Sequence, residues 1–191
     1  MDRHLYLALM TLIIAFGLAA YVDGLAAAPP PAPTASVPRD PLPESAPLRL
    51  RVPSIGIDTH FVPLGLQGNS EVEVPKGFDE VGWYTHGPTP GELGPAVVLG
   101  HVDSRYGPGV FTDLEAVAAG DRIYVDREDG TTATFEVTHA ERYRQDAFPS
   151  SAVYGNIPYA GIRLITCAGI FSPTIRRYDH VHVVYGRLVE S

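Results

Sequence analysis

Short runs of β-branched and aromatic residues, each bounded by glycine, proline or aspartate, constrain the fold of this chain more than any other feature. Apolar and polar residues alternate along them with a period of two, which is typical of strands. Helical periodicity never extends beyond two or three turns, and VFTDLEAV (110–117) is the best helix candidate. Glu128-Asp129-Gly130, between two runs, is a hairpin turn signal. We therefore expect an all-β fold, either a closed barrel or a sandwich. The runs are LRLRVPSI, IDTHFVPLGL, PAVVLGHV, DRIYVDRED, TTATFEVTH, IRLITCAG and DHVHVVYGRLV.

An apolar segment without a charged residue, 5–22, precedes these runs. Its length is at the lower limit for crossing a hydrocarbon core of about 30 Å. Arg3 precedes the segment and Asp23 follows it, so the positive-inside rule places the N-terminus in the cytoplasm and the rest of the chain outside. The alternative is a signal peptide cleaved near Ala26-Ala27-Ala28, but the apolar run is longer than in an ordinary cleaved signal. We predict a single-pass transmembrane helix over residues 1–23.

Residues 24–47 are rich in proline, which favours extended polyproline II geometry. We predict that they form a semi-rigid linker and that residues 48–191 form one folded domain outside the cell, attached to the membrane. The formal net charge of −8 argues against a nucleic-acid partner.

Cys167 is the only cysteine in the chain. In an exported protein a lone cysteine is a buried hydrophobic residue, an intermolecular bridge or a thiol kept for chemistry. A catalytic thiol needs a partner that transfers protons and a cation or dipole that stabilises an oxyanion. His101 ends the run PAVVLGHV, and a histidine at the mouth of a barrel strand can face the end of a neighbouring strand. Residue types alone leave the three interpretations open.

Three motifs occur in an order that resembles the sortases, the membrane-anchored cysteine transpeptidases of Gram-positive bacteria. They are LGHVDS (99–104), TCAG (166–169) and the pair Arg176-Arg177. The stretch GWYTHGPTPGELGPAVVLGHVDSRYGPGVFTDLEAVAAGDRIYV is similar to the actinobacterial class F or class E sortases. The resemblance extends from about Val52 to Val189.

The resemblance implies a closed sortase-type β-barrel of about eight strands with one or two short helices. It implies cleavage of an LPxTG-like sorting signal between Thr and Gly, through a thioacyl intermediate on a cysteine, and transfer of the product to an amine of the cell wall. The implied partners are LPxTG-bearing surface proteins and the amine of a peptidoglycan precursor or of a pilin lysine. Neither a cofactor nor a metal ion is implied.

The resemblance also assigns roles to residues. Cys167 would be the nucleophile, and His101 would protonate the leaving amine and then activate the incoming one. Arg176 or Arg177 would hold the oxyanion and the substrate. Because successive strand residues point to opposite faces, at most one of these guanidinium groups enters the site, and we expect Arg176. The supporting residues would be Thr166 and Asp103.

Three alternatives compete with this hypothesis. An L,D-transpeptidase is suggested by Thr85-His86-Gly87, although the Ser-x-Gly expected before its cysteine is missing. The same barrel could also be an inactive binding module on a stalk. A zinc site is the third alternative, because His180 and His182 share a strand face and could bind a metal together with Cys167.

Overall fold

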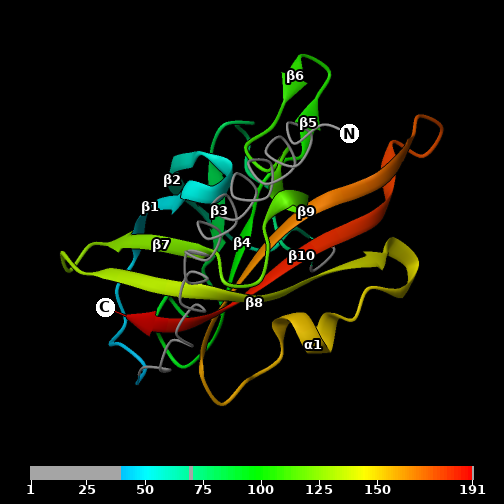
Figure 1. Cartoon of the computed structure of the whole chain (residues 1–191). Helices are drawn as coiled ribbons and strands as arrows, with labels where there is room; N and C mark the ends of the chain where they lie inside the picture. Colours follow the sequence, from blue (N-terminus) through cyan, green and yellow to red (C-terminus); the bar gives the residue numbers. More distant parts are fainter. Residues whose placement is uncertain (1–39, 69–70, 191) are drawn as a thin grey trace, which may run out of the picture. The chain divides into compact units, whose positions relative to one another are not determined.

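The computed structural model describes residues 40–68 and 71–190 (Figure 1). The predicted membrane segment and most of the predicted linker lie outside these ranges. Within the two described ranges, none of the helices is both long enough and apolar enough to span a bilayer.

The described residues form mainly strands, in agreement with the predicted all-β class. The strands are β1 (Pro47–Val52), β2 (Ile57–Leu64), β3 (Val81–Tyr84), β4 (Gly94–Leu99), β5 (Asp103–Ser104), β6 (Gly107–Pro108), β7 (Arg122–Arg127), β8 (Thr132–Arg144), β9 (Ala160–Ser172) and β10 (Arg177–Glu190). The helical elements are the 3-10 turns η1 (Pro53–Ile55), η2 (Leu114–Ala116) and η3 (Gln145–Ala147) and the helix α1 (Ser150–Tyr154).

Eight of these strands close into a barrel in the order β1-β2-β3-β4-β9-β10-β8-β7. The pairs β2–β3 and β4–β9 are parallel and the other barrel pairs are antiparallel. The strands β5 and β6 form a separate small hairpin, and β9 and β10 run side by side as a long ribbon (Figure 1). The predicted closed barrel is confirmed, and the sandwich is excluded because closure leaves no open edge between two sheets.

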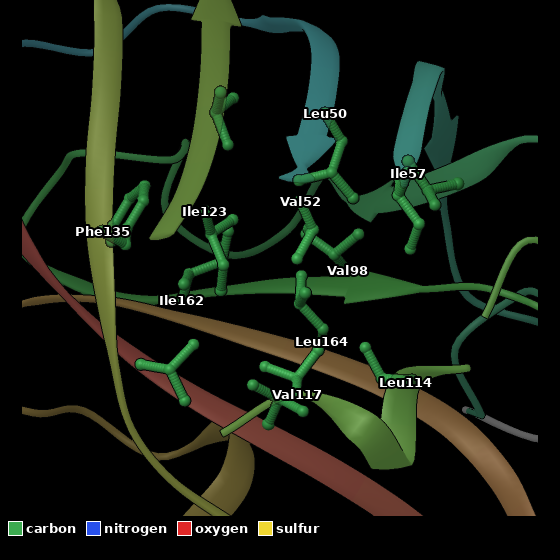
Figure 2. Packing of buried hydrophobic residues seen from close by; sticks show 14 of the residues in the cluster. Leu50, Val52, Ile57, Val98, Leu114, Val117, Ile123, Phe135, Ile162 and Leu164 are labelled. Atoms are coloured by element: carbon green, nitrogen blue, oxygen red, sulfur yellow. The ribbon is translucent and has the colours of Figure 1, made fainter. Parts of the chain in front are cut away.

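Alternating apolar residues from the barrel strands meet inside the barrel and form its core (Figure 2). Burying such side chains contributes about 1.5–3 kcal/mol each to the free energy of unfolding. In β9 the residues on this inner face include Ile162 and Leu164. Strand alternation therefore turns Ile165 and Cys167 to the other face of the sheet. Labelled in Figure 2 are Leu50, Val52, Ile57, Val98, Leu114, Val117, Ile123, Phe135, Ile162 and Leu164.

The helix expected over 110–117 is reduced to the 3-10 turn η2. Phe111, Leu114 and Val117 are buried in the barrel core, so their spacing reflects packing of a loop onto the barrel rather than helical periodicity. The hairpin signal is confirmed, since Gly130 has φ 82° in the turn between β7 and β8. No pattern in the sequence indicates the position of α1, which has only five residues.

The folded domain begins before the predicted boundary at Leu48. Leu42 donates its backbone N–H to the carbonyl of Gly91 (2.8 Å), and the carbonyl of Pro43 accepts a hydrogen bond from Arg127. The Arg127 side chain is buried, and a buried guanidinium needs acceptors. The last residues of the expected linker therefore supply polar groups to the barrel.

Candidate active site

The thiol of Cys167 lies on the outer face of the barrel wall. Cys167 pairs with Val181 of β10, and its neighbour on the same face, Ile165, belongs to a second apolar cluster outside the barrel. The side chain of Cys167 is exposed. The buried-hydrophobe interpretation is therefore wrong, and the thiol can meet a substrate.

Parallel pairing of β4 with β9 brings the histidine motif to the cysteine motif. The last pair of this ladder is Leu99 with Ile165, and His101 and Cys167 each follow two residues later. Two further hydrogen bonds extend the contact: the N–H of Gly100 donates to the carbonyl of Ile165 (3.1 Å), and the hydroxyl of Thr166 donates to the carbonyl of Gly100 (2.9 Å). His101 and Cys167 consequently line one cavity.

The imidazole of His101 is held from two sides. Its Nε2 lies 2.7 Å from the backbone oxygen of Pro75, and because a carbonyl only accepts, Nε2 carries the hydrogen of this bond. The ring of Phe78 lies against the imidazole, with 4.7 Å between the centroids. The carbonyl of His101 accepts the N–H of Phe111 (2.9 Å). A glycine is required at position 109, where a Cβ would lie 2.3 Å from that carbonyl oxygen.

Asp103 connects the histidine loop to the ribbon that carries Cys167. The hydroxyl of Tyr178, on β10, donates a hydrogen bond to its carboxylate. Loss of solvent around the phenol, together with this hydrogen bond and the negative charge of Asp103, raises the pKa of Tyr178 to about 12. The ring of Tyr178 also packs on Phe171, with centroids 5.3 Å apart. Tyr178 therefore remains a neutral hydrogen-bond donor beside the thiol at physiological pH.

The surroundings of Cys167 favour the protonated thiol. Although the side chain is exposed, the cavity walls displace part of the solvent around the sulfur, and this partial loss of solvent raises its pKa most. The carboxylate of Asp103 raises the pKa further. The guanidinium of Arg177 acts in the opposite direction and lowers the pKa. Because the net shift is upward, the thiolate is the minor form at neutral pH.

Replacing Asp103 with asparagine should lower the pKa of the Cys167 thiol. The substitution removes a negative charge that disfavours the thiolate, so at pH 7 a larger fraction of the protein carries the nucleophilic form. We expect iodoacetamide to alkylate Asp103→Asn faster than the wild type at pH 7, with the pH midpoint of the alkylation rate moved to lower pH. Asp113→Asn, an exposed change away from the cavity, is the matched control. An unchanged or higher midpoint in Asp103→Asn would contradict the assignment.

The two arginines differ in their relation to the thiol. Arg176 lies in the turn between β9 and β10 with φ 51°, whereas Arg177 begins β10 and pairs with Ser172. Both side chains are exposed, and neither lines the cavity. Arg177 is the arginine whose charge acts on Cys167. Strand pairing fixes Arg177 against β9, whereas Arg176 sits in the turn.

The cavity in front of the thiol has a volume of about 820 Å³, within the range of binding sites for small molecules and short peptides. Its apolar wall combines outward-facing strand residues with residues of the β8–β9 connection. Acidic side chains, Glu71, Asp103 and Asp146, lie among its lining residues. The apolar lining residues include Val97, Leu99, Ile165, Val181, Phe148 and Tyr154.

The proposed zinc ligands do not come together. His180 pairs with Ala168 and His182 pairs with Thr166, which are the two neighbours of Cys167 in β9. Alternation therefore places them on the opposite face of the ribbon from the thiol. Across residues 40–68 and 71–190, no cluster of three or more histidine, cysteine or acidic side chains could hold a metal ion.

Sequence reasoning missed two groups of the site. The Pro75 carbonyl is a backbone atom of a segment without a motif, so no residue type could reveal it. Tyr178 belongs to none of the motifs that the sequence analysis identifies. The signal that could have pointed to Tyr178 is its position directly after the pair Arg176-Arg177.

An exposed thiol and an oriented histidine in one cavity are typical of cysteine enzymes that transfer acyl groups. The comparisons with known proteins specify the class further. The sortase domain family matches residues 50–189. The chain belongs to the sortase family, whose members are cell-surface cysteine transpeptidases.

Solved sortase structures share this fold at low sequence identity. The Streptococcus agalactiae sortase C1 complex with MTSET is 21% identical with a TM-score of 0.58, over 78% of this chain and 71% of that one. Sortase C-1 from Actinomyces oris is 21% identical with a TM-score of 0.57, over 75% and 73%. Sortase A from Corynebacterium diphtheriae is 20% identical with a TM-score of 0.57, over 78% and 63%. The comparison with curated protein sequences gives no match.

The family match decides between the alternatives. It contradicts the L,D-transpeptidase hypothesis, and His86, on which that hypothesis was based, is a lining residue of the sortase cavity. Class F or class E membership remains a prediction.

Proposed function

We propose that this sortase cleaves an LPxTG-like signal of surface proteins between Thr and Gly and transfers the threonyl product to an amine of the cell wall. The observation that carries the proposal is the exposed Cys167 thiol beside His101 in one cavity with an apolar wall. Such a wall suits the Leu and Pro side chains of the signal. The acceptor is the amine of a peptidoglycan precursor or a pilin lysine.

In the first half of the reaction, the Cys167 thiol gives its proton to His101, and the sulfur attacks the Thr carbonyl carbon. The C–N bond to Gly then breaks, the Gly nitrogen takes a proton from His101 and leaves as an amine, and a thioester remains on Cys167. The bond between Nε2 and the Pro75 carbonyl leaves Nδ1 as the ring nitrogen for this transfer. Because the raised pKa of Cys167 leaves only a minority of molecules with the thiolate at neutral pH, we expect slow turnover.

In the second half, the acceptor amine attacks the thioester carbonyl and gives its proton to His101. The C–S bond breaks, the released thiolate takes the proton back from His101, and the enzyme returns to its starting state. In both halves negative charge develops on the Thr carbonyl oxygen, and Arg177 supplies the positive charge that stabilises it. Thr166 supports the site by bonding the Gly100 carbonyl, and Asp103 does so through Tyr178.

The position in the cell follows from the predicted N-terminal segment. A single-pass helix over residues 1–23 and the proline-rich linker would hold the barrel on the outer face of the membrane. Sorting signals and wall precursors would reach the cavity there.

Mass spectrometry of the protein incubated with an LPxTG peptide library tests the proposed function. A peptide that is cleaved should leave a thioacyl adduct on Cys167, with a mass that identifies both the signal and the cleaved bond. If every peptide of the library leaves the thiol unmodified, LPxTG signals are not the substrates.

Arg177→Ala and Arg176→Ala should differ strongly in their effect on turnover. Loss of an oxyanion contact costs about 2.7–4 kcal/mol in the transition state, so we expect Arg177→Ala to lower kcat by about 10²–10³-fold. Arg176→Ala, a matched change at the adjacent exposed position, should leave kcat nearly unchanged. Steady-state cleavage of the adduct-forming peptide measures both. A large loss of kcat in Arg176→Ala, with little change in Arg177→Ala, would instead assign oxyanion stabilisation to Arg176.

A further inference from the structure

We propose that Asp179 is a positioning residue, whose carboxylate locks a bulge in the β9–β10 ribbon and thereby fixes Arg177 and Tyr178 relative to Cys167. The inference rests on the proposed function, since it concerns how the nucleophile and its cation are placed. Asp179 follows Tyr178 directly, and its side chain contacts the segment that follows Cys167.

The bulge is visible in the pairing of the two strands. Cys167 pairs with Val181 and Ala168 with His180, but the next pair is Phe171 with Tyr178. Residues 169 and 170 of β9 are therefore opposed by the single residue 179 of β10. Gly169 has φ 82°, the left-handed conformation that the first residue of a glycine bulge adopts.

One oxygen of Asp179 holds this bulge together. Oδ1 accepts the backbone N–H of Ile170 at 2.7 Å and lies 2.8 Å from Nδ1 of His180. It also occupies the space beside Gly169, where a Cβ would lie 2.1 Å from it. The contact with His180 and the N–H of Ile170 lower the pKa of Asp179, so the group is an anion at neutral pH. The extra residue of β9 is thus retained by a side chain rather than by the strand ladder.

The bulge separates the nucleophile from the groups that act on it. Cys167 lies on one side of it, and Arg177 and Tyr178 lie on the other. If the extra residue were released, pairing beyond the bulge would slip by one position, and a slip of one residue exchanges the faces of a strand. Arg177 and Tyr178 would then no longer be where they act on the thiol and on Asp103.

Other charged groups surround Asp179 but do not replace its contact with the bulge. Arg144 of β8 forms an ion pair with Asp146 at 2.7 Å. The negative charge of Asp179 also raises the pKa of the Arg144 guanidinium. The charge of His180 contributes to lowering the pKa of Asp146. The N–H of Ile170 has its hydrogen bond with Asp179.

The test compares three variants of the full chain. Asp179→Ala removes the acceptor, Asp179→Asn keeps an acceptor oxygen in the same place, and Asp179→Glu keeps the charge but moves it by one methylene. We expect Asp179→Ala to lower kcat for the adduct-forming peptide by about 10–100-fold with little change in KM, because misplacement of catalytic groups acts on the chemical step. Asp179→Asn should retain most of kcat and Asp179→Glu should not.

Asp121→Ala is the matched control, because Asp121 also accepts a backbone N–H, that of Ala118 at 3.0 Å, away from the cavity. Its kcat should equal that of the wild type. A second readout is independent of turnover: iodoacetamide reacts with the single thiol, and Asp179→Ala should move the pH midpoint of alkylation upward, since Arg177 no longer lowers the pKa of Cys167. This readout remains informative even if no LPxTG peptide is cleaved, so it distinguishes failure of the inference from failure of the proposed function.

A double-mutant cycle distinguishes positioning from general destabilisation. If Asp179 acts through Arg177, then Asp179→Ala should have a much smaller effect on the alkylation midpoint in an Arg177→Ala background. The proposal is overturned if the two effects on the midpoint add independently, or if Asp179→Ala behaves like Asp121→Ala. Should Asp179→Ala fail to fold, Asp179→Glu takes its place in the cycle with the same expectation.

Discussion

Cys167→Ala should abolish both cleavage of the sorting signal and transfer to an amine. Cys167 is the only thiol in the chain, so no other residue can form the thioester. The side chain is exposed, and its removal leaves no cavity in the core. The melting temperature should therefore stay close to that of the wild type while product falls below detection in a peptide-cleavage assay.

The comparison with Cys167→Ser sharpens this result. The serine keeps the size of the side chain but is not ionised at neutral pH, so we expect it to be inactive as well, with the fold intact. Retention of full cleavage in Cys167→Ala would reject the transpeptidase mechanism. An unfolded Cys167→Ala protein would assign the thiol a structural role instead.

His101→Ala should lower kcat by about 10²–10⁴-fold, the usual contribution of a positioned general acid and base. The loss should affect both halves of the reaction, because the leaving amine needs a proton and the incoming amine must lose one. Single-turnover measurements of adduct formation, followed by release with an added amine, measure the two halves separately.

His60→Ala is the control for this variant, since His60 is an exposed residue of β2 that does not line the cavity. Its rates should match those of the wild type. If the adduct forms at the wild-type rate in His101→Ala, then proton donation to the leaving group comes from another residue. Tyr178 would be the first candidate, because its hydroxyl keeps its proton beside the thiol.

The strand content of the fold could be predicted because a half-buried strand has a pattern that is local in sequence. The β7–β8 hairpin is an example, since its turn residues and both flanking runs lie within one short segment. The failed helix prediction over 110–117 has the opposite cause. Phe111 and Leu114 are apolar because they are buried in the barrel core, and a contact made by a loop imposes no helical period.

The site could be predicted only as a set of residue types. His101 and Cys167 were identified from motifs, but their proximity depends on the parallel pairing of β4 with β9, which joins Leu99 to Ile165 across the sequence. Parallel strands are joined by long connections. The residues of one strand do not indicate which distant strand pairs with it. The Pro75 carbonyl on His101 likewise depends on where a segment without regular pattern lies.

The choice between Arg176 and Arg177 cannot be made from strand alternation. Alternation alone allowed either residue of the pair, and the expectation fell on Arg176. The ribbon has a bulge between Cys167 and the arginines, and Arg176 sits in the turn. A bulge places two residues of one strand opposite a single residue of the other. The number of residues between Cys167 and an arginine therefore does not indicate whether the two side chains lie close together.

The sequence by itself determined the all-β class, the candidate cysteine and histidine and the family resemblance, because each depends on residues that are close together in the chain. The tertiary structure decided which strands pair, which face carries the thiol, and which charges act on it. Strand pairing, the face of the thiol and the charges near it all depend on contacts between segments that are distant in sequence. Such contacts form only when the barrel closes. The opposing effects of Asp103 and Arg177 on the pKa of Cys167 are of this second kind.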